Sequence, residues 1–145
     1  MGSISSSTTK HYNNLKSAEV KTEVRSAGSR GKGLFASQKI KKGSVIIEYI
    51  GELIDEAEYL RRYDQYKSQS FHHDYFASLN ENQILDATRL GNHGRFGNHS
   101  CDPNAFFDTI ALKDSNVEVL FIFASKNIKE GEEITLSYDL SLIHI

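Results

Sequence analysis

The apolar residues of this chain fall in short runs, and that spacing constrains the fold more than any other feature of the sequence. The runs at 45–50 and 117–123 are rich in β-branched and aromatic residues, which favour buried strands. Alternation of apolar and polar residues predicts a strand at 20–24, and another begins at 34–36 after a glycine-rich turn at 28–33. Short strands with little helix predict a mostly β fold, built as an irregular stack of small sheets.

One segment has the spacing of an amphipathic helix. Asp55 followed by Glu58 is typical of a helix start, and Glu58 lies four residues before Arg62, where the two side chains can pair. We therefore predict one main helix over 55–68. One face of that helix carries three tyrosines, which we expect to pack on a sheet: Tyr59, Tyr63 and Tyr66.

Two patterns predict turns. Residues 80–82 separate short strands at 74–79 and 83–85, which is the pattern of a hairpin. The pattern FAS-x-x-IK-x-G-x-x-I occurs twice, at 35–46 and 123–134. Two copies are too few for a repeat protein. Either an element was duplicated or one turn chemistry was used twice, and we favour the second, because glycine supplies the positive φ that such a turn needs.

Length and composition exclude several classes of protein. A chain of 145 residues is one domain; we expect it to span 18–145, after a polar leader at 1–17 that we predict to be disordered. The formal charge of −2 gives no general affinity for nucleic acid. The single cysteine, Cys101, excludes an internal disulfide and a zinc site of several cysteines. The sequence contains neither an apolar run of membrane-spanning length nor a secretory signal, so a soluble protein in a reducing compartment is expected.

Two motifs suggest a chemistry. Residues 95–104 (RFGNHSCDPN) gather an amide, an imidazole, a hydroxyl and a thiol, and residues 131–139 (GEEITLSYD) follow. Together they resemble the signature of SET-domain lysine methyltransferases, and the resemblance runs from about 31 to 139. It implies methyl transfer from S-adenosylmethionine to a lysine side chain, with a histone tail as the expected substrate. It also implies the SET-domain fold, in which the C-terminal segment is threaded in a knot-like way that is rare among proteins.

The resemblance assigns the cofactor site. In the family, a Gly-x-Gly turn contacts the methionine part of the cofactor, the Asn amide bonds its amino group, and the backbone around the His reads the adenine edge. Carried over to this chain, the cofactor-binding residues are Lys32, Gly33, Arg95, Phe96, Asn98 and His99. Gly97 stands where larger apolar residues are usual, which predicts looser packing or a larger pocket.

The resemblance also places three tyrosines near the transfer centre. Tyr138 would fix the sulfonium geometry there. Tyr75 would line the lysine channel and orient the amine through its hydroxyl, although a tyrosine half-buried on a strand also serves as packing. The tyrosine equivalent to Tyr49 lies near the reaction centre in some members of the family and serves in packing in others. Leu136 stands in the substrate channel where the family has Phe or Tyr, and its lack of a hydroxyl favours di- or trimethylation.

The chain departs from many histone-methylating members, because it lacks their cysteine-rich modules before and after the SET domain. Cys101 then has no zinc partners, so we expect no metal and interpret its thiol as a small buried group. Either the chain is a truncated fragment of a larger methyltransferase, or it is a minimal enzyme that closes its site in another way, with a dimer possible.

A second function class remains open. A catalytically silent SET-like domain that binds a peptide or a partner protein is the alternative to an enzyme. The joint presence of Asn98, His99 and Tyr138 favours the enzyme, since a silent domain has no need of all three. The resemblance implies a nuclear protein, with the cytoplasm as the other option. We expect no direct nucleic-acid partner and no membrane.

Overall fold

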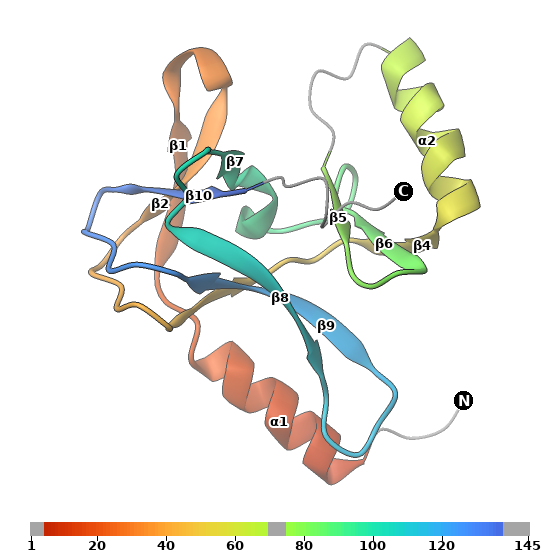
Figure 1. The fold of residues 1–145 in the computed structure, drawn as a ribbon, viewed down its shortest axis with the longest axis horizontal. Helices are drawn as coiled ribbons and strands as arrows, with labels where there is room; N and C mark the ends of the chain where they lie inside the picture. The colour runs from red at the N-terminus through yellow and green to blue at the C-terminus, as the bar shows by residue number, and fades with distance from the viewer. Residues whose placement is uncertain (1–4, 70–74, 138–145) are drawn as a thin grey trace.

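Three small sheets form the body of the protein (Figure 1). The computed structural model describes residues 5–69 and 75–137. The elements are α1 (Ser6–Ser17), β1 (Thr22–Ser26), η1 (Gly28–Arg30), β2 (Lys32–Ala36), β3 (Val45–Glu48), β4 (Glu52–Asp55), α2 (Glu56–Ser68), β5 (Phe76–Ser78), β6 (Gln83–Asp86), η2 (His93–Phe96), β7 (Asn98–His99), β8 (Ala105–Ala111), β9 (Glu118–Ala124) and β10 (Glu133–Leu136). The strand orders are β1-β2-β10-β7, β3-β9-β8 and β4-β6-β5. The predicted fold class, mostly strands in small sheets, is confirmed. The predicted knot-like threading stays a prediction.

One apolar core joins the sheets. Leu34 of β2, Ile46 of β3, Leu120 and Ile122 of β9, and Ile134 of β10 are all buried in the same cluster. Ile46, Leu120 and Ile122 come from the apolar runs at 45–50 and 117–123 that predicted strands. No described helix is both long enough and apolar enough to cross a bilayer.

The two copies of the repeated pattern pair with each other. Gly43 and Gly131 occupy equivalent positions with φ of 89° and 86°, which confirms that glycine supplies a positive φ in both turns. Ile40 and Ile128 form a bridge in which each backbone amide donates to the other's carbonyl, at 2.9 and 2.8 Å. Each glycine amide donates to the carbonyl of the alanine in the other copy's FAS segment, in both cases at 2.8 Å. The two turns therefore hold each other in place.

Helix α2 forms where the local signals predicted it. Asp55 is its N-cap, and the Asp55 carboxylate accepts the Glu58 amide at 2.8 Å. The rings of Tyr59 and Tyr66 contact Phe76 of β5, with centroids 4.7 and 5.9 Å apart. The expected packing of the tyrosine face on a sheet is confirmed for these two rings.

A buried ion pair ties α2 to β6. The Arg62 Nη1 donates to the Asp86 Oδ2 at 2.9 Å, and the Asp86 side chain is 0% exposed. The Tyr66 hydroxyl donates to the same oxygen at 2.8 Å, and the Thr88 amide donates to Oδ1 at 2.9 Å. Burial alone would raise the pKa of the Asp86 carboxyl, but the bonds from Thr88 and Arg62 hold it below its usual range. The carboxylate is therefore charged and fully partnered in the interior.

Helix α1 overturns one prediction. Its residues belong to the segment 1–17, which we predicted to be disordered because its composition is polar, and for residues 6–17 this was wrong. The helix lies beneath the β8–β9 hairpin (Figure 1) and makes polar contacts with distant residues. The buried Thr8 hydroxyl donates to the Lys113 carbonyl, and the Tyr12 hydroxyl donates to the Glu48 carboxylate. Burial and the Glu48 carboxylate raise the pKa of Tyr12 above its usual value.

Candidate functional site

The two motifs lie side by side. Strand β7 pairs in parallel with β10, with Asn98 opposite Thr135 and His99 opposite Leu136. The Ser100 amide continues this pairing, because it donates to the Leu136 carbonyl at 2.9 Å. The sheet therefore brings together two segments that are far apart in the sequence.

Asn104 fixes this arrangement, and the sequence analysis missed it. Its Oδ1 accepts the Thr135 amide at 2.8 Å, and its Nδ2 donates to the Glu133 carbonyl at 2.9 Å. The side chain thus bonds β10 as a neighbouring strand would. In the sequence its one signal is an amide directly after the chain's single proline, Pro103, at the end of the motif at 95–104; its burial appears only in the structure.

Four of the expected cofactor residues form one cluster. The Asn98 Nδ2 donates to the Lys32 carbonyl at 3.0 Å, so β7 lies directly beside the Gly-x-Gly turn. A Cβ added at Gly33 would lie 3.2 Å from that same nitrogen. The Lys32 ammonium lies over the Phe96 ring, 6.0 Å from its centroid. A pocket of about 460 Å³ borders the turn and is lined by Val24, Arg25, Ser26, Gly28, Gly31 and Lys32.

Arg95 connects this cluster to Tyr75. The Arg95 guanidinium lies 4.8 Å from the centroid of the Phe96 ring and 5.3 Å from that of the Tyr75 ring. Those two rings meet edge to face at 5.8 Å. The Arg95 Nη1 donates to the Ala87 carbonyl at 2.9 Å, while its buried Nε has no hydrogen-bond partner among the described residues. Tyr75 is thus in contact with the wall of the cofactor cluster.

Glu133 supports the cluster from β10, and the sequence analysis missed it too. Its side chain is 13% exposed. The Glu133 Oε2 accepts the Asn98 Nδ2 at 2.9 Å, and its Oε1 pairs with the Arg30 Nη2 at 2.5 Å. A Cβ at Gly33 would lie 2.7 Å from Oε2, so a glycine is needed for this carboxylate to sit here. A side chain at this position would displace the Glu133 carboxylate.

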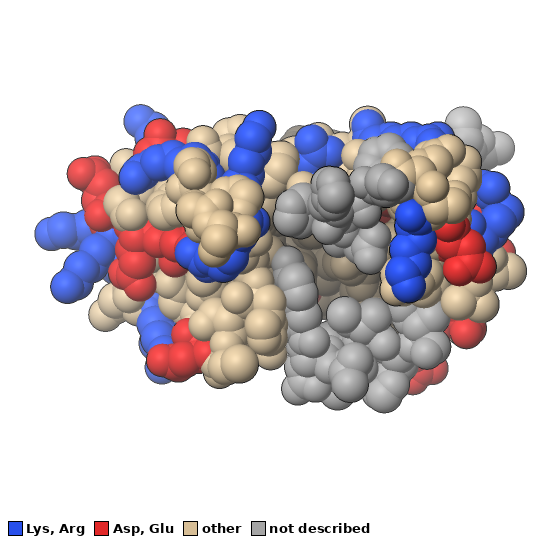
Figure 2. All heavy atoms as spheres, turned by 90° about the horizontal axis from the view of Figure 1, so that it is seen from above, with Lys and Arg blue, Asp and Glu red and all other residues tan. Residues whose placement is uncertain are grey.

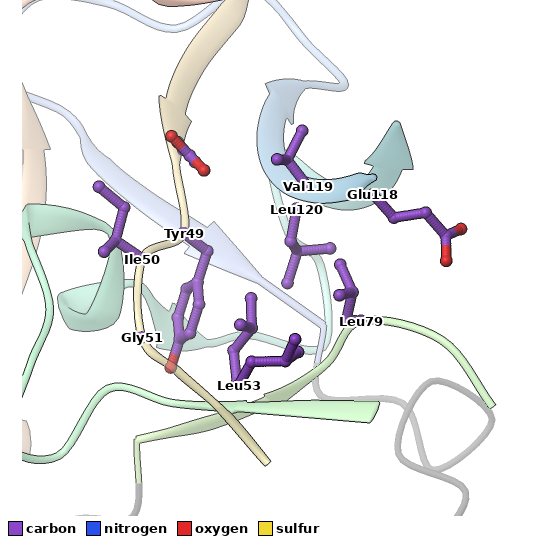
Figure 3. A pocket seen from close by; sticks show the side chains of 10 residues that line it. Tyr49, Ile50, Gly51, Leu53, Leu79, Glu118, Val119 and Leu120 are labelled. Atoms are coloured by element: carbon purple, nitrogen blue, oxygen red, sulfur yellow. The ribbon is translucent and has the colours of Figure 1, made fainter. Parts of the chain in front are cut away.

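Tyr49 lies in an apolar pocket of about 220 Å³ (Figure 3). Its buried ring meets the Phe107 ring edge to face, with centroids 5.6 Å apart. Figure 3 shows Leu53, Leu79 and Leu120 gathered beside the Tyr49 ring, whereas the Glu118 carboxylate points away from them. Its surroundings fit both roles that the resemblance allows, because the ring is packed and also lines a pocket.

Leu136 corrects the expectation for Gly97. The Leu136 side chain is 1% exposed, and a Cβ at Gly97 would lie 2.7 Å from the Leu136 Cδ1. The absence of a side chain at Gly97 therefore does not loosen the packing, because Leu136 occupies the space. A place for Leu136 in a substrate channel stays a prediction.

Three predicted residues remain, and they are His99, Cys101 and Tyr138. His99 and Cys101 are both exposed, with the Cys101 Sγ 3.8 Å from the His99 Nε2. The expectation of a buried Cys101 thiol was wrong, because the chain turns outward after β7, where the Asp102 amide donates to the Ser100 Oγ. Tyr138 lies outside the described residues, so its role stays a prediction. Within residues 5–69 and 75–137, His, Cys, Asp and Glu form no group of three or more that could hold a metal ion.

Charged side chains of both signs are interspersed on the surface of the molecule. Figure 2, a view from above, shows Lys and Arg side chains among Asp and Glu side chains at both ends of the molecule. At the start of α2, Glu58 bonds both Arg61 and Arg62, and these bonds lower the pKa of Glu58 to about 2. The charge of Glu58 is therefore neutralised by two arginines of its own helix.

Comparison with known proteins agrees with this geometry. A family model described as SET domain matches residues 31–139. The chain is 39% identical over 131 residues to "Histone-lysine N-methyltransferase, H3 lysine-36 specific" of Gibberella zeae, covering 90% of this chain and 13% of that protein. Proteins of the same description in Coccidioides immitis and Candida albicans are 40% and 42% identical over 120 residues, or 83% of this chain. The chain spans only 12–14% of the length of these three relatives.

Proposed function

Because the chain belongs to the SET-domain family, we propose that it is a protein-lysine N-methyltransferase that uses S-adenosylmethionine. One observation carries the proposal. Asn98 bonds the backbone of Lys32, 66 residues earlier, so the central motif and the Gly-x-Gly turn meet in one cluster. A silent domain that only binds a partner does not need this contact between the two motifs, so the contact favours the enzyme.

The cluster fits the amino-acid part of the cofactor. The missing Cβ of Gly33 lets the Asn98 amide and the Glu133 carboxylate come close to the backbone of the turn. Both described hydrogen bonds of the Asn98 side chain use its Nδ2, so its Oδ1 is available to accept a bond from an ammonium. Lys32 adds a cation over Phe96. When bound, S-adenosylmethionine supplies an electrophilic methyl group on a positive sulfonium.

The protein's own task is to align a neutral amine with that methyl group. A free lysine has a pKa of ~10.4. Apolar surroundings disfavour the charged form and lower that pKa. The edge-to-face pairs Tyr49–Phe107 and Tyr75–Phe96 supply aromatic surface of this kind. Holding the two reacting groups in line then contributes to the rate, because a bimolecular step becomes effectively unimolecular.

We propose a histone tail as the substrate, with lysine 36 of histone H3 as the first candidate, because the similar proteins bear that specificity in their descriptions. A nuclear location goes with this substrate. The acidic residues of α2 are poor candidates for the tail-binding surface, since Asp55 caps the helix and Glu58 is paired with its own arginines.

Labelled methyl transfer tests the proposal. The chain is incubated with labelled S-adenosylmethionine and with nucleosomes that carry either normal H3 or H3 with arginine in place of lysine 36. Transfer to the first alone is expected. Transfer to both would show that a lysine other than lysine 36 of H3 is methylated. Cofactor binding without transfer to either substrate would favour the silent domain.

The Asn98→Ala variant tests the cofactor site by calorimetry. It removes a hydrogen bond to a charged group, which is worth about 1.5–3 kcal/mol, so the cofactor dissociation constant should rise by about tenfold or more. An unchanged constant with the fold intact would place the cofactor elsewhere.

A further inference from the structure

We infer that Glu133 is a positioning residue that fixes which way the Asn98 side-chain amide faces, and so selects a ligand that carries an ammonium group. This inference rests on the proposed function, because the ligand is the amino-acid part of S-adenosylmethionine. It assigns a task to a carboxylate on β10 that the family resemblance did not single out.

The first step concerns the amide itself. An asparagine side chain presents a donor group and an acceptor oxygen, and its neighbours decide which way round it sits. The Asn98 amide has two acceptors on one side, the Glu133 Oε2 at 2.9 Å and the Lys32 carbonyl at 3.0 Å. Neither acceptor can donate, so Nδ2 must face them and Oδ1 must face away.

The second step concerns the carboxylate. Glu133 is held by the pairing of β10 with β2, where it lies opposite Phe35, and by the bond from Asn104 to its backbone carbonyl. Its Oε1 is taken by Arg30. The Oε2 is thereby directed at Asn98, and the missing side chain of Gly33 gives it room. The orientation of the Asn98 amide is therefore built into the sheet before any ligand arrives.

The third step predicts what a neutral residue would do. Glu133→Gln keeps the size of the side chain but adds a donor. The new NH₂ group cannot accept a bond from the Asn98 Nδ2, but it can donate to the Asn98 Oδ1. We expect this bond to outweigh the Lys32 carbonyl, the one acceptor that still holds Nδ2, so that the Asn98 amide turns over. An Nδ2 group would then face the ligand's ammonium, and two donors cannot bond each other. Discrimination in favour of the ammonium would be lost, while the adenosine part of the ligand would be unaffected.

Calorimetry with two ligands tests this step. The first is S-adenosylhomocysteine, and the second is the same molecule with hydrogen in place of its amino group. The unmodified protein should bind the first at least about tenfold more tightly. In Glu133→Gln the first ligand should bind at least about tenfold more weakly and the second should be unchanged, so the preference disappears. Equal weakening of both ligands would show a purely structural role, and an unchanged preference would also overturn the inference.

Two control variants separate this effect from a general change of charge. Glu130→Gln makes the same substitution at an exposed position close by in the sequence and should change neither affinity. Arg30→Gln removes the partner of Oε1 but leaves the bond to Asn98, so the preference for the ammonium should persist. If the unmodified protein binds neither ligand, the proposed function itself fails, and that result is distinct from loss of the preference.

A measurement without substitution covers the case in which Glu133→Gln does not fold. In the labelled, unmodified protein, the Asn98 Nδ2 protons should be protected from solvent exchange both with and without S-adenosylhomocysteine, because protein acceptors hold them in both states. Protection that appears only with ligand would contradict a preset amide.

Discussion

Replacing Arg62 by methionine tests the energetic weight of the buried pair between α2 and β6. The substitution keeps a long, unbranched side chain but removes the cation beside Asp86, whose carboxylate is 0% exposed. Removing one member of a buried pair typically costs about 3–5 kcal/mol, because the other charge is left buried. The Arg62 side chain is 18% exposed, so water partly screens the pair and the lower end of that range, about 3 kcal/mol, is expected.

Urea unfolding and thermal unfolding measure this loss. For a chain of this size, a loss of about 3 kcal/mol corresponds to a fall in Tm of about 6–12 °C. Arg61→Met is the matched control. Arg61 lies on the same helix but its guanidinium pairs with the partly exposed Glu58, so its removal should change stability by less than about 1 kcal/mol.

The pH dependence gives the sharper test. Asp86 has a lowered pKa in the folded protein, so its contribution is present above the unfolded pKa of ~3.9 and is lost as the pH falls through the lower folded value. Without Arg62, one of the bonds that lower the folded pKa is lost, so the Asp86 carboxyl is protonated at a higher pH in the variant than in the unmodified protein. The difference in stability between the two proteins should therefore be largest near neutral pH and shrink as the pH falls through the folded pKa of the variant and then that of the unmodified protein. A difference that is independent of pH, or below about 1 kcal/mol at neutral pH, would refute this account of the pair.

Two further predictions follow from the site. Gly97→Ala forces a methyl group against the Leu136 Cδ1 and should destabilise the protein by about 1–3 kcal/mol, as measured by urea unfolding. The Gly97→Ala/Leu136→Val double variant should lose less stability than the sum of the losses of the two single variants, because the shorter side chain makes room for the methyl group. Strict additivity would argue against the contact. Tyr138→Phe should preserve cofactor binding and lower kcat and kcat/KM together, because the hydroxyl would act on the transfer geometry while the ring packs. Unchanged turnover would assign Tyr138 to the core.

Local signals in the sequence predicted α2 and both turns of the repeated pattern. Asp55 and Glu58 determine a helix start by themselves, and a glycine determines a turn wherever the chain needs positive φ. Helix α1 could not be predicted in this way. Its stability comes from polar contacts of Thr8 and Tyr12 with distant residues, and composition does not report such contacts.

Strand β8 was also missed, for a different reason. Phe106 and Phe107 are adjacent aromatics on opposite faces of the strand, and each has its own partner. Phe106 stacks on Phe123, whereas Phe107 meets Tyr49. This strand therefore shows no alternation of apolar and polar residues. In the candidate site, the motif residues could be named from the sequence, but the supports from Glu133 and Asn104 depend on strand pairing between distant segments.

The mutual bonding of the two repeated turns affects how the chain is made. The bridge from Ile40 to Ile128 encloses most of the sequence, so a nascent chain on the ribosome cannot complete the first turn until the second has emerged. Contacts of such long range slow folding, because the intervening chain must be ordered before they form. Until then, the first copy exposes unpaired amides and carbonyls that invite pairing with other chains. Because this bridge closes late, the first turn stays unpaired while the ribosome synthesises the residues between the two turns. During that interval the nascent chain is exposed to aggregation and to chaperones.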